Sequence, residues 1–308
     1  MGGASFDPGH FASFTASHVA GKTTHQIFSA TSLRDSLDPM RMKNMMRESC
    51  DDAVCPESTA IIVGLDETGS MHVIPKYMVD TGFPNLFEEI YDRKPVTNPH
   101  IMFMGIGDDK MDRHPMQISQ FEAGMSLAPQ LTDIYLEGNG GGNGTEGYTF
   151  AWYMAAMHTK IDCFEKRGKK GFLFTVGDEG PNMILRKSDI QRVVGTEVAA
   201  DLTAQQLLDM VSRQYHIFHV MVEEGNHFRH YGKDVTRAWR NLLGERALLM
   251  SDYTKLSEVI VTAIQSVAGD SVDTIVKSWK DPGTRAVVAR AIGDLAPTKS
   301  NSGGVVRF

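Results

Sequence analysis

The chain has 308 residues, of which 42% are hydrophobic and 22% are charged, the composition of an ordinary soluble globular protein. Its formal net charge of −7 argues against the nucleic-acid backbone as the main binding partner, because phosphate contacts require clustered Lys and Arg. The sequence contains three cysteines, no signal-peptide pattern and no apolar run of the ~20 residues that cross a membrane, so we expect a cytoplasmic protein without a membrane partner.

The composition divides the chain into three regions. Residues 1–58 are rich in Ser, Thr, His and Gly, which predicts an N-terminal arm that packs on the main domain and carries a short helix near residues 38–48. Residues 59–268 alternate apolar strands with helices and are expected to form the main domain. Residues 269–308 are expected to form a C-terminal helical extension and a flexible polar tail.

Short apolar runs and helical periodicity predict the elements of the main domain in chain order. We expect strands at residues 59–65, 100–106, 131–137, 171–176, 216–222 and 247–250. We expect helices at residues 75–91 (broken at 82–84), 148–164, 203–215, 235–243 and 254–267, followed by 273–279 and 284–295. This alternation predicts an α/β fold with a doubly wound, mostly parallel central sheet, helices on both faces and one antiparallel edge strand, at residues 131–137.

Oxygen-bearing side chains follow three of the predicted strands. One loop reads Asp66-Glu67-Thr68-Gly69-Ser70, the second ends a glycine run at Gly144-Thr145-Glu146, and the third is Gly177-Asp178-Glu179. In a doubly wound fold, ligands bind at the carboxyl ends of the strands, so we expect the three loops to converge. Each loop alone is better explained as an ordinary turn or helix cap, and only the combination indicates a site.

Four chemistries compete for these loops. A P-loop is disfavoured because Gly21-Lys22-Thr23 lacks both the earlier glycine, replaced by Ala16, and a preceding strand. An aspartyl phosphotransferase would want a second carboxylate at Thr68, and a serine hydrolase would want a histidine paired with Ser70. A hard divalent cation fits best, since Mg²⁺ (or Mn²⁺) prefers oxygen ligands. The predicted ligands are Asp66, Thr68, Ser70, Thr145 and Asp178.

The same residues resemble a known motif. Asp66-x-Thr68-Gly69-Ser70, with Thr145 and Asp178 in later loops, is similar to the metal-ion-dependent adhesion site of von Willebrand factor type A domains. The segments PESTAIIVGLDETGSM, LEGNGGGNGTEGY and DCFEKRGKKGFLFTVGDE further resemble a subgroup of uncharacterised bacterial and phage proteins, in which case a virion location is the other expectation.

The resemblance implies a site, a strand order and a partner. It implies that Ser70 and Thr68 bind the metal, that Thr145 binds it directly or through water, and that the acids act largely through water. It also implies that the strands preceding Asp66 and Asp178 are neighbours, and that the partner supplies an Asp or Glu and is a AAA+ ATPase of the MoxR kind. Glu67, Glu146 and Glu179 make this rim unusually acidic, and each is a candidate for the metal shell.

Other metal-binding residue types do not form a convincing pattern. Cys50 and Cys55 have no second pair that would complete a zinc site. His216 and His219, three apart on a strand, are expected to point to opposite faces, and His227 and His230 are expected in a loop.

The sequence therefore predicts a metal-dependent protein-binding or adaptor module and not an enzyme. Two alternatives stay open: a metal-assisted phosphoryl hydrolase that uses Asp66 or a metal-bound water, and a structural or assembly protein of a phage particle.

Overall fold

A computed structural model describes residues 7–42, 46–71, 73–137 and 144–295 of the chain. Its centre is a six-stranded sheet with the order β12-β11-β7-β2-β3-β4. All neighbouring strands are parallel except β4, which pairs antiparallel with β3 at one edge. The strands are β2 (Thr59–Asp66), β3 (Pro99–Ile106), β4 (Met116–Ile118), β7 (Gly171–Gly177), β11 (Tyr215–Val222) and β12 (Ala247–Met250). The predicted fold class, doubly wound and mostly parallel, is confirmed.

Helices cover both faces of the sheet, because the central strands are apolar on both sides. Successive residues of β2, such as Ile61 and Ile62, point to opposite faces and belong to different hydrophobic clusters. One cluster is completed by α3 (Val73–Tyr77), α4 (Phe83–Arg93), α5 (Leu127–Thr132), α11 (Leu256–Ala268) and α13 (Pro282–Ile292). The other is completed by α6 (Tyr148–Met157), α8 (Lys187–Val194), α9 (Ala204–Val211) and α10 (Asn226–Leu243).

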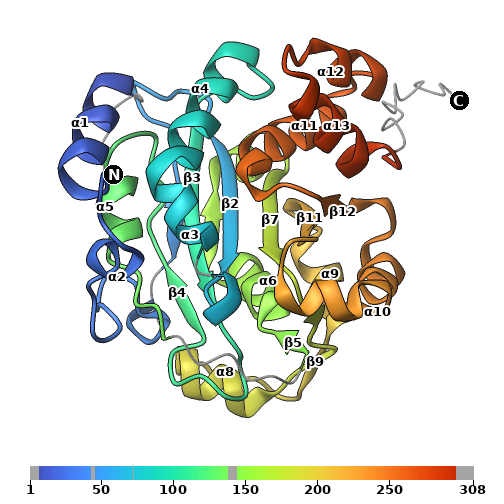
Figure 1. Ribbon diagram of the computed structural model, residues 1–308. Helices are drawn as coiled ribbons and strands as arrows, with labels where there is room; N and C mark the ends of the chain where they lie inside the picture. The colour runs from blue at the N-terminus through green and yellow to red at the C-terminus, as the bar shows by residue number, and fades with distance from the viewer. Residues whose placement is uncertain (1–6, 43–45, 72, 138–143, 296–308) are drawn as a thin grey trace, which may run out of the picture.

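The two ends of the chain add to the first face. Helix α1 (Pro8–His18) lies near α4, and α2 (Thr24–Ile27) lies near α3 (Figure 1). Phe11, Ile27 and Phe28 are buried in the same cluster as the sheet residues. At the other end, α12 (Val272–Ser278) and α13 pack beside α11. Within the described residues, no helix is both long and apolar enough to span a bilayer.

The predicted edge strand at residues 131–137 is wrong. Helix α5 ends at Thr132, and the edge of the sheet is β4. The backbone of Tyr135 does face a partner, but that partner is the side chain of Gln117, whose Oε1 accepts from the Tyr135 N–H (2.9 Å) and whose Nε2 donates to its carbonyl (2.7 Å). A side-chain amide thus takes the place of a strand, and hydropathy alternation cannot distinguish the two.

Other boundaries differ for local reasons. Residues 39–42 form a 3-10 turn, and residues 47–49 form strand β1 (Arg47–Ser49), so the helix expected over 38–48 is absent from the described part of that range. The long helix predicted from residue 148 ends at Met157, because the chain then forms strand β6 (Thr159–Ile161), which pairs with β1, and α7 (Asp162–Glu165). The break expected at residues 82–84 is instead a π-helical turn, Met78–Gly82, that joins α3 to α4.

Helix α10 begins nine residues earlier than the predicted start at Val235. His227 and His230 therefore lie on a helix and not in a loop, which corrects the prediction. Its N-terminus is capped from a distance: the Asp178 carboxylate, in another loop, accepts from the His227 N–H (2.8 Å). A local cap is the usual start signal in a sequence, and here Gly225 provides no side-chain cap. The glycine run at residues 138–143 and the tail at 296–308 lie outside the described residues.

Candidate metal centre

The sheet brings the first and third oxygen-bearing loops together. Strands β2 and β7 are parallel neighbours, with Leu65 opposite Val176. Asp66 ends β2 and Asp178 follows the end of β7, so both carboxylates lie at the carboxyl edge of adjacent strands, as expected. Both side chains are almost completely buried, with 1% of each exposed.

The second loop joins them through a small sheet of its own. Thr145 and Glu146 form strand β5, which pairs in parallel with β8, Gly180–Pro181, directly after the third loop. Thr145 is half-buried, whereas Glu146 is buried. Pairing of β5 with β8 therefore fixes the second loop to the third, and the three loops converge as the sequence predicted.

Both oxygens of the Asp66 carboxylate accept hydrogen bonds. Its Oδ1 accepts from the Thr68 N–H (2.9 Å) and the Thr68 hydroxyl (2.6 Å), and its Oδ2 accepts from the Tyr148 hydroxyl (2.7 Å). Because Thr68 donates its proton to Asp66, the lone pairs of the Thr68 Oγ1 are left for another partner. An acid that orients a hydroxyl in this way suits a cation site in which the hydroxyl is the direct ligand.

Two glycines allow this packing. A Cβ at Gly177 would overlap the Tyr148 hydroxyl and lie 2.8 Å from the Asp66 Oδ2, so no larger residue leaves that hydrogen bond intact. A Cβ at Gly225 would overlap the Asp178 side chain. Both positions are close approaches between a backbone and a carboxylate, and they hold Asp66 and Asp178 in place.

Several buried carboxylates lie together at this edge of the sheet. Burial raises the pKa of Asp66 to about 6, although hydrogen bonds from Thr68 and Tyr148 oppose part of the effect. Burial, followed by repulsion from Asp66 and Asp178, raises the pKa of Glu179 to about 7. The pKa of Glu146 is raised strongly by burial and by the charges of Asp66 and Glu179. Burial also raises the pKa of Asp178.

Several carboxylate oxygens in this cluster lack a donor. In the part of the chain that the structure describes, Asp178 Oδ1, Glu146 Oε2 and Glu179 Oε2 are buried without a hydrogen-bond partner. Such oxygens are costly to bury unless a cation or proton compensates them. The residues present therefore fit a hard cation, with Thr68 and Thr145 as neutral oxygen donors and Asp66 and Asp178 as the source of charge.

The acids and histidines alone do not make a metal site. Among the described residues, no three His, Cys, Asp or Glu side chains are arranged to hold one ion, so a cation here depends on hydroxyl ligands. His219 is buried and stacks on Trp239 at 3.6 Å, and its Nδ1 is 2.9 Å from the Thr175 hydroxyl. His216 lies on the other face of β11, against Phe172, as expected.

Two further residues of the first loop, Ser70 and Glu67, were also candidates for the metal shell. Ser70 lies in a short 3-10 helix, Gly69–Met71, and its side chain is outside what the structure describes. Glu67 faces away from Asp66 and toward β4, where its carboxylate accepts from Gln117 Nε2 (2.8 and 2.9 Å). Glu67 therefore belongs to the packing of the sheet edge and not to the convergence of the loops.

A fourth loop at the same edge was not predicted from the sequence. It follows β3 and contains the buried acids Asp108, Asp109 and Asp112. Lys110 in this loop donates to Asn182 Oδ1 (2.6 Å) and to the Thr145 hydroxyl (3.3 Å). A signal does exist in the sequence Gly107-Asp108-Asp109-Lys110, which directly follows an apolar strand.

Two solved structures illustrate what the chain is similar to. No protein-family model matches the chain, and no curated protein matches it. The pilus adhesin SpaC from Lactobacillus rhamnosus GG is 10% identical with a TM-score of 0.47, over 70% of this chain and 31% of that chain. A von Willebrand factor type A protein from Catenulispora acidiphila is 13% identical with a TM-score of 0.38, over 70% of this chain and 44% of that chain.

This chain thus spans less than half the length of either structure. Likenesses this distant carry no conclusion about activity or partners. The description of the fold rests on the sheet order and the loop geometry given above.

Proposed function

We propose that this protein is a divalent-cation-dependent protein-binding module of the von Willebrand factor A type. Asp66, Thr68, Ser70, Thr145 and Asp178 would hold Mg²⁺ or Mn²⁺ at the carboxyl edge of β2 and β7. The observation that carries the proposal is the pairing of the Thr68 hydroxyl with Asp66, next to the unpartnered, buried Oδ1 of Asp178. When bound, the cation supplies a positive centre for an anionic ligand.

The composition of the site favours a carboxylate from a partner as that ligand. Asp66 already accepts three hydrogen bonds, and Asp178 already accepts one from helix α10, so neither acid is fully available to neutralise a cation. An ion held largely by hydroxyls and waters retains net positive charge, and an Asp or Glu of a second protein would complete its shell. The resemblance implies a AAA+ ATPase of the MoxR kind as the source of that residue.

Affinity capture with and without EDTA tests the proposal. The tagged wild-type protein is expected to retain its partner in Mg²⁺ and release it in EDTA. Asp66→Ala and Thr145→Ala should abolish capture, whereas Asp209→Ala, at an exposed acid on α9, should not change it. Capture that persists in EDTA, or in the double variant of Asp66 and Thr145, contradicts the metal bridge.

The same preparations separate the two alternative functions. A phosphatase and nuclease screen in Mg²⁺ and Mn²⁺ is expected to show no turnover, and turnover lost in Asp66→Asn would favour a hydrolase. If EDTA lowers the unfolding temperature and releases no protein, the cation serves only to stabilise the loops, as in an assembly protein.

A further inference from the structure

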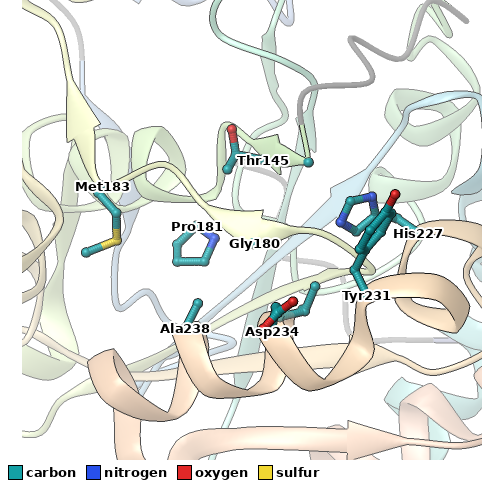
Figure 2. A pocket seen from close by; sticks show the side chains of 10 residues that line it. Thr145, Gly180, Pro181, Met183, His227, Tyr231, Asp234 and Ala238 are labelled. Atoms are coloured by element: carbon teal, nitrogen blue, oxygen red, sulfur yellow. The ribbon is translucent and has the colours of Figure 1, made fainter.

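A groove of about 480 Å³ opens directly beside Thr145. One wall is the segment after the third loop, with Gly180, Pro181 and Met183. The other wall is helix α10: in Figure 2 Ala238 lies below Pro181, and the Tyr231 ring lies beside His227 at the other end of the groove. A predicted metal ligand thus forms one border of the groove.

The lining of the groove is largely apolar although it faces solvent. Met183 and Tyr231 each expose 57% of their surface, and Ile184, the next residue after Met183, exposes 52%. Val235 and Ala238 of helix α10 also line the groove. Large apolar side chains that border a concave surface in this way mark a place where an apolar group can be buried.

The neighbouring face of α10, which shares Tyr231 and Asp234 with the groove, carries positive charge. Arg229 and Lys233 are exposed there and border a second, wider hollow of about 810 Å³. Within that hollow Arg237 pairs with Asp234 and Arg290 pairs with Glu223, so those charges are balanced locally. In a chain with a net charge of −7, a cationic helix beside a cation site favours an acidic ligand.

Helix α10 is fixed to the third loop at two points, so the groove keeps a set position relative to the metal centre. The Asp178 Oδ2 accepts from the His227 N–H (2.8 Å), and the Trp239 Nε1 donates to the Glu179 carbonyl (2.9 Å). A partner residue that reached the cation would therefore place its sequence neighbours along α10.

We propose that the occupant of this surface is an acidic segment of a partner protein that carries a large apolar residue next to its metal-binding carboxylate. The carboxylate completes the cation site, the apolar side chain enters the groove beside Met183 and Tyr231, and flanking acids meet Arg229 and Lys233. This inference rests on the proposed function, and it adds which partner segments are selected.

The test uses the full chain and a defined set of fluorescein-labelled peptides in Mg²⁺. Each peptide has one central Asp, followed by either Leu or Ser, in a background of either Glu or Lys. Fluorescence polarisation is expected to show binding of the Asp-Leu peptide in the Glu background at least about tenfold tighter than that of the Asp-Ser peptide, as expected for burial of one large apolar side chain. The Lys background should weaken binding further.

Two matched variants test whether the preference for Leu over Ser depends on the groove. Ala238→Glu puts a charge on the groove wall at a half-exposed helical position and should remove the preference for Leu over Ser. Asn241→Glu makes the same change in charge at an exposed position of the same helix, outside both hollows, and should preserve the preference. Mg²⁺ binding, followed by calorimetry, should be the same in both.

The outcomes separate a failure of the groove to select the partner from a failure of the proposed metal centre. If calorimetry shows no Mg²⁺ binding, the proposed function fails and this inference fails with it. If Mg²⁺ binds and the peptides show no preference, or Ala238→Glu leaves the preference unchanged, the groove does not select the partner, while the metal centre stands. Self-association of the chain in Mg²⁺ that competes with the peptides would identify a second copy as the occupant and overturn the inference.

Discussion

The hydrogen bond between Tyr148 and Asp66 should make a large and measurable contribution to folding. Tyr148 is fully buried, and its hydroxyl donates to the Asp66 Oδ2 at 2.7 Å. In Tyr148→Phe the ring still packs against Trp239, so apolar contacts are retained and only the donor is lost. Loss of a buried hydrogen bond to a charged group costs about 1.5–3 kcal/mol, because the acceptor is left unpaired.

Chemical denaturation in EDTA measures this contribution. Urea unfolding of Tyr148→Phe, followed by far-UV circular dichroism well above the Asp66 pKa of about 6, should show a free energy of unfolding lower by about 2 kcal/mol. Tyr153→Phe is the matched control, since it makes the same change in the same helix. In the described part of the chain, the buried Tyr153 hydroxyl has no hydrogen-bond partner, so its loss should cost at most about 0.5 kcal/mol. Equal losses in the two variants would refute the reasoning.

Two further predictions concern the residues around the same loops, and a third concerns Asp51. Gly225→Ala should destabilise the fold by about 1–3 kcal/mol, because its Cβ overlaps Asp178, and urea unfolding that matches wild type would contradict the packing. Lys110→Met should tighten Mg²⁺ binding, since it removes an ammonium that donates to the Thr145 hydroxyl, and unchanged or weaker binding by calorimetry would show that the two do not compete. Burial alone would raise the pKa of Asp51. Hydrogen bonds from Arg167 and Ser58 outweigh burial and lower this pKa from 3.8 to about 2. The ionised Asp51 therefore stabilises the fold above about pH 4, and the free energy of unfolding should fall by about 1–2 kcal/mol as the pH falls toward 2. Unfolding measured as a function of pH should show this loss in the wild type and not in Asp51→Asn.

The parts of the fold that follow local chemistry were predictable from the sequence. The apolar run that forms β2 and the polar residues at its end follow each other directly, and parallel strands bring their carboxyl ends to one edge. The start of the helix expected from residue 203 is equally local, since the Thr203 side chain accepts from the Gln206 N–H at the N-terminus of α9. Asp66, Thr145 and Asp178 can therefore be grouped from the amino-acid sequence alone.

The features that were missed depend on partners far apart in the chain. Helix α10 begins at Asn226 because Asp178 caps it from another loop. Residues 131–137 alternate like a strand, but the backbone of Tyr135 pairs with the side chain of Gln117. Lys110 follows a predicted strand, but its position in the sequence does not show that its ammonium contacts the Thr145 hydroxyl. Hydropathy periodicity carries no information about such contacts.

Direct titration of the cation tests the central claim. Isothermal calorimetry of Mn²⁺ into the wild-type protein is expected to show saturable binding that Mg²⁺ displaces. Thr68→Val keeps the shape of the side chain and removes the hydroxyl that is paired with Asp66, so the same titration should show binding that is lost or greatly weakened, with the folded circular-dichroism spectrum retained. Saturable binding of equal affinity in wild type and Thr68→Val, or no saturable binding in the wild type, would contradict a metal centre at these loops.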